Sequence, residues 1–352
     1  MTKKKEKNFS QSAQRIKKDK VMMATLTPRE KELVAVIQSD IPIVERPYKQ
    51  LAERIGWSER DVIDSIRTLM ENGVIRAFSP VFEARLLGYV STLVAVEIDR
   101  ENVDDLAAAL FPINEITHNY LRNHAFALWF TISAQSETVI DSLLSWVARY
   151  PGVKRVMNLP ALNVYKVRAV FGDTSPQKTN FPENTVSQAF TTDEMLLVRC
   201  LQDGFPLVEY PFENIAQKLG AGEADIIDTV RNWVETGVIR RFGARLNHQR
   251  AGYRANTLAV WKPDDCDTVG GLFASMQWVS HCYRRQSYPD WPYELYTMIH
   301  AQSEEELNEH LSHMRSQTPE TGVILLATLR ELKKTTMKYF PEEGSWDSPK
   351  PV

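Results

Sequence analysis

The sequence is poor in the features that mark secreted, membrane and metal-binding proteins. Its 352 residues include only three cysteines, an odd number that cannot close a disulfide framework and that shows no metal-ligand spacing. No apolar run approaches the roughly 20 residues that a membrane span needs, and no apolar segment follows the lysines near the N-terminus. These absences predict a cytoplasmic protein that does not contact a membrane.

Common catalytic and cofactor motifs are also absent. The chain has no glycine-rich phosphate loop, GxSxG, HExxH or CxxC motif, so we expect neither a nucleoside triphosphate, a flavin nor a structural zinc. The formal net charge of -3 gives no overall basic bias toward nucleic acid. Any anion-binding surface must therefore be local.

What the sequence does contain is an internal repeat with a period of about half the chain. The segment LAERIGWSERDVIDSIRTLMENGVIRAFSPVFEARLLGY is matched by IAQKLGAGEADIIDTVRNWVETGVIRRFGARLNHQRAGY, and farther on THNYLR is matched by SHCYRR. The length alone favours two or more domains. We infer a duplicated unit of several secondary-structure elements rather than a solenoid of short repeats.

Each copy has the element order of a winged helix-turn-helix followed by an αβ domain. A helical segment precedes a short helix that ends at Gly56 or Gly220, and a longer amphipathic helix and a strand that starts with GVI come next. The remainder of each copy alternates as βαββαβ, which predicts a ferredoxin-like sandwich. The predicted fold class is therefore α+β, a tandem duplication of a winged helix-turn-helix plus a ferredoxin-like sandwich.

The predicted domain boundaries follow from these elements and from the polar segments between them. We expect a disordered basic arm over residues 1–23, a winged helix-turn-helix over 24–88, a ferredoxin-like domain over 89–171, a linker over 172–188, a second winged helix-turn-helix over 189–252, a second ferredoxin-like domain over 253–340 and a tail over 341–352.

The start of each predicted recognition helix argues against DNA binding. Such a helix meets phosphates and base edges through Arg, Lys, Asn or Gln. Carboxylates predominate there instead: Glu59, Asp61 and Asp64 beside Ser58 and Arg60 in the first copy, and Glu223, Asp225 and Asp228 beside Gly222 in the second. We expect the helix-turn-helix domains to serve in packing or dimerisation, and only the lysine-rich arm favours DNA binding.

Polar residues that do not fit a core pattern gather on the two middle strands of each predicted sandwich. A His-x-Tyr-x-Arg pattern occurs in both copies, and the period of two in a strand places its three side chains on one face. The repetition favours a site, although duplication also copies structural residues. The two trios are His118, Tyr120 and Arg122, and His281, Tyr283 and Arg285.

A cationic cluster follows the predicted wing of the second copy. Its members are Arg240, Arg241, Arg245, His248, Arg250 and Arg254, whereas the first copy has only Arg76 and Arg85. A solvated wing is one interpretation. If the cluster converges with His281 and Arg285, it forms a pocket for a ligand with several carboxylates, because arginine pairs with carboxylates bidentately. Flat apolar walls would come from Trp261, Trp291 and Tyr293.

With these residues the sequence resembles the siroheme decarboxylases, which are Lrp/AsnC-like proteins of the alternative heme and heme d1 pathways. The resemblance covers about residues 26–340. It is carried by IRRFGARLNHQRAGYRAN, WVSHCYRR, WPYELYTMIH and LRELKKTTMKYF in the second half and by HNYLRNHAFALWFTI in the first. The family works as a pair of related subunits, and the resemblance implies that both are fused here into an internal pseudo-heterodimer.

The resemblance also implies a substrate and a reaction. Siroheme is a flat iron tetrapyrrole with eight carboxylates, and the family removes carbon dioxide from its C12 and C18 acetates to give 12,18-didecarboxysiroheme. No cofactor is implied beyond the iron of the substrate. The competing hypothesis is an Lrp/AsnC-type transcription regulator that senses a tetrapyrrole or another small ligand.

On this basis we assign roles to the candidate residues. His281 is the first choice for general acid or axial ligand of the substrate iron, with His118 in the equivalent role in the first half and Tyr283 orienting or donating. Because the first half lacks the arginine cluster, we expect one main catalytic pocket in the second half. The residues expected to bind substrate are Arg240, Arg241, Arg245, His248, Arg254, Arg284, Arg285, Trp291 and Tyr293, with Arg122 and His124 from the first half.

Overall fold

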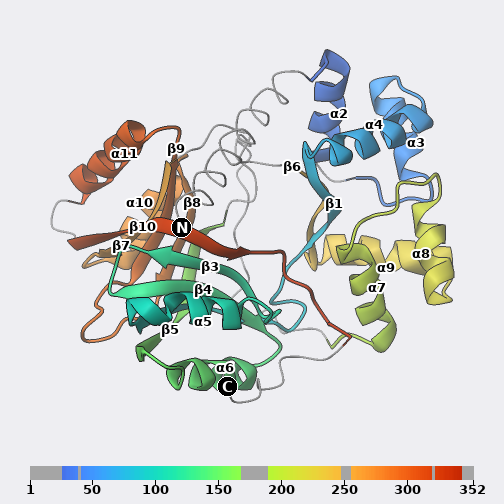
Figure 1. The fold of residues 1–352 in the computed structure, drawn as a ribbon. Coiled ribbons are helices and arrows are strands. Elements are labelled where there is room, and N and C mark those ends of the chain that lie inside the picture. The colour runs from blue at the N-terminus through green and yellow to red at the C-terminus, as the bar shows by residue number, and fades with distance from the viewer. Residues whose placement is uncertain (1–25, 39–40, 168–188, 247–254, 319–321, 343–352) are drawn as a thin grey trace, which may run out of the picture. The chain divides into compact units, whose positions relative to one another are not determined.

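The computed structural model describes residues 26–38, 41–167, 189–246, 255–318 and 322–342. The chain divides into two compact units, and each unit combines one domain type from both halves of the sequence (Figure 1). One unit joins Met1–Leu87 with Ser187–Gly252, and the other joins Gly88–Val186 with Tyr253–Val352. The predicted arm and linker, and nearly all of the predicted tail, lie outside the described residues.

The helix-turn-helix unit contains three described helices and one strand from each half. A proline at the start and a glycine with left-handed backbone at the end bound the middle helices: Pro47 and Gly56 (φ 66°) in α3, and Pro211 and Gly220 (φ 67°) in α8. The elements are α2 (Pro28–Gln38), α3 (Pro47–Ile55), α4 (Glu59–Glu71) and β1 (Ile75–Phe82), then α7 (Thr192–Gln202), α8 (Pro211–Leu219), α9 (Glu223–Glu235) and β6 (Ile239–Leu246).

The strands of this unit pair across the two halves. β1 and β6 form a two-stranded antiparallel sheet. Matching backbone hydrogen bonds flank it: the Ile41 amide donates to the Phe242 carbonyl, and the Phe205 amide donates to the Phe78 carbonyl, both at 2.8 Å. Each helix-turn-helix copy is therefore completed by the strand of the other copy.

The second unit has the βαββαβ order twice, as the sequence predicted. The first copy comprises β2 (Val90–Ile98), the short 3-10 helix η1 (Arg100–Asn102), α5 (Val103–Leu110), β3 (Ile116–Arg122), β4 (Phe126–Ala134), α6 (Glu137–Ala148) and β5 (Val153–Val167). The second copy comprises β7 (Ala255–Lys262), α10 (Cys266–Ser275), β8 (Val279–Arg285), β9 (Leu295–Ala301), α11 (Glu304–Gln317) and β10 (Gly322–Lys334). The duplicated α+β fold class is confirmed.

Two long strands join these copies into one closed barrel, in the order β10-β3-β4-β2-β5-β8-β9-β7. The first part of β5 pairs with β2 up to Pro160, and the second part, from Ala161, pairs with β8. In the same way β10 pairs with β7 up to Ala327 and with β3 from Thr328. Each copy therefore lends the end of its last strand to the sheet of the other copy.

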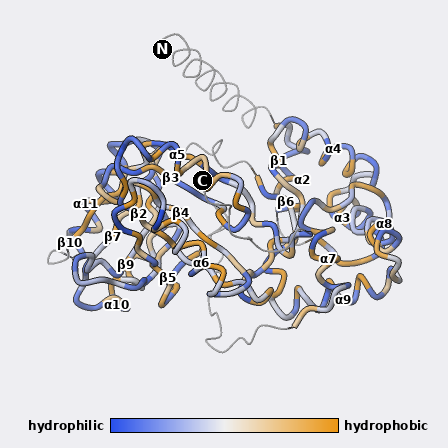
Figure 2. Tube along the Cα trace, turned by 60° about the horizontal axis from the view of Figure 1, so that its bottom comes forward, coloured by the Kyte–Doolittle hydropathy of each residue, from blue (hydrophilic) through white to orange (hydrophobic). Residues whose placement is uncertain are grey.

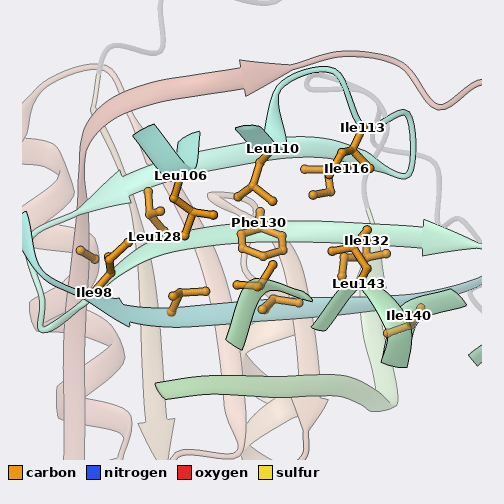
Figure 3. Packing of buried hydrophobic residues seen from close by; sticks show 14 of the residues in the cluster. Ile98, Leu106, Leu110, Ile113, Ile116, Leu128, Phe130, Ile132, Ile140 and Leu143 are labelled. Carbon is orange, nitrogen blue, oxygen red and sulfur yellow. The ribbon is translucent and has the colours of Figure 1, made fainter. Parts of the chain in front are cut away.

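Three apolar clusters hold the described part of this unit together. One lies beneath α5 and α6, where Leu106, Leu110 and Leu143 surround Phe130 of β4 (Figure 3). A second lies beneath the helices of the second copy. The third lies inside the barrel, draws on strands of both copies and is rich in aromatic rings, including Trp129, Trp291 and Tyr296. Apolar and polar positions alternate along the elements of both units, as expected where one face is buried (Figure 2).

The same hydrogen bond from a lysine to a carbonyl occurs at both positions where a strand passes from one copy to the other. Lys166 of β5 donates its ammonium to the Met276 carbonyl at 2.6 Å, and Lys333 of β10 donates to the Ile113 carbonyl at 2.7 Å. Both carbonyls follow the first helix of the opposite copy. The pseudo-twofold relation thus extends from the backbone to individual side chains.

Among the helices that the structure describes, none is long and apolar enough to cross a membrane.

Candidate functional site

The two His-x-Tyr-x-Arg trios lie on equivalent strands of the barrel. On β3 the rings of His118 and Tyr120 stack at 6.3 Å, and the Arg122 guanidinium lies 5.3 Å from the Tyr120 ring centroid. The corresponding distances on β8 are 6.1 Å between His281 and Tyr283, and 4.7 Å from the Arg285 guanidinium to the Tyr283 centroid. In each trio the three side chains lie together on one strand face.

A β-bulge precedes each trio and sets this face. On β8 Val279 pairs with Ile299 and His281 pairs with Met298, so Ser280 is an extra residue in the strand. On β3 the register shifts in the same way between Ile116 and His118. Bulges redirect the side chains that follow them and are frequent beside functional sites. The histidines therefore owe their direction to an irregularity that a period of two does not reveal.

The trio arginines are held by main-chain oxygens of the exchanging strands. The Nη1 of Arg285 donates to the Leu159 carbonyl of β5, and the Nη1 of Arg122 donates to the Leu326 carbonyl of β10, both at 2.7 Å. Burial lowers the pKa of both guanidinium groups, that of Arg122 to about 10. Among the described residues neither arginine has an acidic partner, and the buried Nε of each has no hydrogen-bond partner.

A buried cation without a counter-charge is costly unless an anion neutralises it. With Nη1 engaged by a carbonyl, the Nε–H of each guanidinium is a buried donor that none of the described residues accepts from. The equivalent arginines therefore give each half of the barrel one group suited to a carboxylate.

In the second trio a buried hydroxyl lies between two imidazoles. The Ser280 side chain, in a residue that is 1% exposed, lies 2.9 Å from the Nδ1 of His281 and 2.8 Å from the Nε2 of His300. Burial lowers the pKa of His300 to about 4, and the nearby Lys334 ammonium adds to this. His300 is therefore neutral at pH 7. Neither Ser280 nor His300 belongs to the His-x-Tyr-x-Arg pattern, so only the structure connects them to His281.

The equivalent hydroxyl of the first half has a different neighbour. The Oγ1 of Thr117 lies 2.9 Å from the Nδ1 of His118 and 3.1 Å from the Oγ1 of Thr131. Serine, Ser133, stands at the β4 position that matches His300, and it contacts Ser91 at 2.7 Å. The two trios are alike, but the groups behind their histidines are not.

The aromatic candidates lie inside the barrel or beneath its helices. Trp291 is 2% exposed, donates its indole N–H to the Tyr296 hydroxyl at 2.7 Å and contacts Trp129 at 5.8 Å, so it joins the two halves of the core. Tyr293 packs against Trp291 at 5.1 Å and is half-buried. Trp261 packs on Phe273 at 4.8 Å in the cluster beneath α10, which assigns it to the hydrophobic core instead of a pocket wall.

Two further candidates have local partners. His124 follows β3, accepts the Phe126 amide at its Nδ1 (3.1 Å) and stacks on the Phe126 ring at 6.0 Å, and burial lowers its pKa. Arg284 forms an ion pair with Glu294 at 3.0 Å, which raises the pKa of the guanidinium. Arg284 therefore differs from Arg285 in having a carboxylate partner within the chain.

The predicted arginines of the second wing lie on β6 of the helix-turn-helix unit. Arg240 lies 3.6 Å from the Glu83 carboxylate, Arg241 donates to the Gln38 carbonyl at 3.0 Å, and Arg245 donates to the Ser79 hydroxyl at 3.1 Å. All three contact the first half. His248 and Arg254 lie outside the described residues. The expected convergence of this cluster with His281 and Arg285 stays a prediction.

The recognition helices α4 and α9 use their central arginines in equivalent contacts between the copies. Arg67 binds Asp64 at 2.6 Å and the Leu207 carbonyl at 3.3 Å. Arg231 binds Asp228 at 2.7 Å and the Ile43 carbonyl at 3.1 Å. These basic groups thus take part in joining the two helix-turn-helix copies.

The fold and these paired cationic positions define a class: proteins with an AsnC-like ligand-binding domain accompanied by a helix-turn-helix domain, both present twice. The family model of the AsnC-like ligand binding domain matches residues 86–166 and 250–333, and that of the siroheme decarboxylase NirDL-like HTH domain matches residues 30–76 and 194–240. The siroheme decarboxylase of Hydrogenobacter thermophilus is 33% identical over 317 residues, which are 89% of this chain and 95% of that protein.

Solved structures agree with this match. A crystal structure of the siroheme decarboxylase NirDL superposes with a TM-score of 0.74 at 31% identity, covering 90% of this chain and 95% of that one. A second structure of NirDL, in complex with an iron-uroporphyrin III analogue, gives a TM-score of 0.72 at 30% identity, with the same shares covered. This chain belongs to the siroheme decarboxylase family.

Separate subunits of the enzyme match parts of the chain. The beta subunit from Oleidesulfovibrio alaskensis is 41% identical over 158 residues, 44% of this chain and 100% of that subunit. The alpha subunit from Desulfovibrio desulfuricans is 33% identical over 149 residues, 42% of this chain and 86% of that subunit. The two related subunits are thus fused here in one chain, and their αβ domains form an internal pseudo-dimer.

Proposed function

We propose that this chain is a carboxy-lyase that removes the C12 and C18 acetate carboxyls of siroheme and releases 12,18-didecarboxysiroheme, in alternative heme or heme d1 biosynthesis. Membership of the siroheme decarboxylase family supports the proposal, and so does the binding of an iron-uroporphyrin III analogue by the related NirDL. We also propose that the protein works in the cytoplasm, from its few unpaired cysteines.

The observation that carries the proposal is the buried guanidinium of Arg285, which shares a strand face with His281 and Tyr283. Its unpartnered Nε and lowered pKa indicate a cation that an anionic ligand would stabilise. A tetrapyrrole with eight carboxylates supplies such anions together with a flat ring for the aromatic neighbours. Arg285 is the proposed anchor of the carboxylates that do not react, together with Arg240, Arg241, Arg245 and Arg254.

Anchoring supplies the energy for the chemical step. Binding at remote carboxylates can hold the reacting acetate in a poorly solvated position, where loss of its charge as carbon dioxide is favoured. The bond between the carboxyl carbon and the methylene carbon breaks, its electron pair stays on the methylene carbon, and a proton is added there to leave a methyl group. His281 is the proposed proton donor or axial ligand of the substrate iron, and Tyr283 orients or donates.

This sequence of bond changes is redox-neutral and consumes one proton for each acetate. It therefore requires no oxidant, and we propose that no cofactor takes part beyond the iron of siroheme itself. The first half acts as the structural partner, with Arg122, His118 and His124 as its candidate contributions to the site.

We further propose that the chain does not bind DNA through its recognition helices. Acidic residues occupy their N-terminal turns, and their central arginines are engaged by carboxylates and by carbonyls of the other copy. A surface of this kind lacks the phosphate contacts that supply most non-specific affinity for DNA. The regulator hypothesis is not favoured by the family match either.

Anaerobic incubation with siroheme, followed by mass spectrometry, tests the proposed reaction. The expected result is a product that has lost two molecules of carbon dioxide, with an intermediate that has lost one. Absorbance measured in parallel separates binding from turnover. A bound tetrapyrrole that keeps all eight carboxylates after prolonged incubation would show a binding protein and would overturn the proposal.

A further inference from the structure

The hydroxyl of Ser280 has three neighbours and a single proton. It lies 2.8 Å from the Nε2 of His300, 2.9 Å from the Nδ1 of His281 and 3.3 Å from the Met298 carbonyl. A carbonyl only accepts, so a bond to Met298 requires the proton of Ser280. The two lone pairs of the hydroxyl oxygen then accept one N–H from each imidazole. This is the one arrangement that satisfies all three contacts of a nearly fully buried group.

This arrangement determines which ring nitrogen of each histidine carries the proton. His300 donates from Nε2, which agrees with a neutral ring that carries a single proton. His281 donates from Nδ1, so the neutral form of this ring carries its lone pair on Nε2. Histidines that bind metals are commonly oriented in this way, by donating their other ring N–H to a neighbouring acceptor.

In the described part of the first half, no second imidazole lies behind His118. Behind His118 the hydroxyl of Thr117 meets another hydroxyl, that of Thr131. Two hydroxyl groups can each donate or accept, so this pair accommodates either tautomer of His118. The difference between the halves therefore lies in a residue behind the trio and not in the trio itself.

We propose that His300 is a positioning residue that, through Ser280, holds His281 in its Nδ1–H tautomer and thereby makes His281 the axial ligand of the substrate iron. This inference rests on the proposed function, because it assigns one of the two roles left open for His281. The proton added to the substrate carbon then comes from another group, with Tyr283 next to His281 as the candidate.

Nitrogen-15 NMR of the histidine rings tests the tautomer in the full chain without any ligand. The expected wild-type spectrum shows His281 protonated at Nδ1 alone, assigned by comparison with His281→Asn. In His300→Ser, which introduces the residue of the first half, His281 is expected to exchange between its two tautomers. His300→Gln can still donate an amide N–H to Ser280 and is expected to keep the wild-type signal.

Titration with iron(III) uroporphyrin III, followed by absorbance, tests iron ligation independently of catalysis. We expect His300→Ser to weaken binding about 10-fold to 100-fold, the usual effect of removing a group that orients a metal ligand, and His300→Gln to restore most of it. The control is Ser133→Ala, at the matching position of the first half, which is expected to bind like the wild type. Melting temperatures confirm that each variant is folded.

A wild-type His281 protonated at Nε2, or a His300→Ser variant equal to the wild type in both measurements, would overturn the inference. Failure of the proposed function is distinguishable from this outcome. If the wild type leaves siroheme intact, the decarboxylase assignment fails, while the ring-nitrogen spectrum still decides the tautomer. If siroheme is turned over and the tautomer of His281 does not depend on His300, only the positioning role fails.

Discussion

The two αβ copies keep the same trio but differ in what lies around it. Each has a stacked histidine and tyrosine and a buried arginine held by a carbonyl of the exchanging strand. Among the residues that the structure describes, a second imidazole, that of His300, lies behind the trio histidine in the second copy alone. The strand and its trio have been retained in both copies, whereas the residues behind the trio histidine have diverged. The first copy therefore keeps the trio in the barrel, although the groups that contact its histidine differ.

The largest expected effect that separates the halves is at the two trio histidines. We expect His281→Ala to lower kcat for siroheme about 100-fold or more, since a positioned acid or metal ligand is worth at least that much. His118→Ala is the matched variant and is expected to cost less than about 10-fold. The measurement is the steady-state rate of siroheme decarboxylation in each variant, with the product quantified by mass spectrometry. Full turnover in His281→Ala would refute its role, and equal losses would show two reactive pockets.

The trio arginines give the next largest difference. Arg285→Met keeps most of the side-chain volume but removes the charge, and we expect it to raise KM about 30-fold or more, as for loss of one partner of a buried charge pair. Arg122→Met is expected to have a smaller effect on KM. A larger effect at Arg122 would move the main pocket to the first half.

Packing of the first helix against the exchanging strand differs between the copies. A Cβ at Gly270 of α10 would come within 2.5 Å of the Tyr165 ring, whereas α5 has Ala107 at this position and Leu332 packs against the cluster that contains Leu106 and Leu110. We expect Gly270→Ala to lower the free energy of unfolding by about 2 kcal/mol through overpacking. Ala107→Gly should cost about 1 kcal/mol through helix propensity alone.

The measurement is denaturant unfolding, and the control is the double variant Gly270→Ala with Tyr165→Leu, which copies the first half. Removal of the ring should recover part of the loss caused by Gly270→Ala. A double variant no more stable than the sum of the two single changes would contradict the proposed clash.

The smallest expected effect concerns acid stability. Burial lowers the pKa of His300 to about 4, below its value near 6.5 in an unfolded chain, so the unfolded state binds a proton first as the pH falls. Stability is therefore lost between pH 6.5 and 4, by about 1 to 2 kcal/mol at pH 5. His300→Gln should flatten this part of the profile, and Ser133→Ala should not. An unchanged slope in His300→Gln would show that His300 does not titrate in this range.

Several features of the site were predictable because they depend on local periodicity. The side chains at 118, 120 and 122 alternate with core residues along one strand, so their common face follows from the extended backbone. The acidic first turns of the recognition helices are likewise visible in the sequence. Residues whose role depends on a distant partner were not predictable. Arg284 and Arg285 are consecutive arginines, yet Arg284 pairs with the Glu294 carboxylate and Arg285 donates to the Leu159 carbonyl.

The sequence by itself determined the duplicated α+β architecture, the two trios and their common faces, because repetition and short-range periodicity are written directly in the order of residues. Only the tertiary structure decided that β5 and β10 leave their own sheets halfway along, that Trp291 fills the barrel, and that Ser280 links two histidines. These outcomes depend on strand register and on contacts between residues far apart in the chain. A single extra residue in a strand changes such contacts without changing the pattern of residue types.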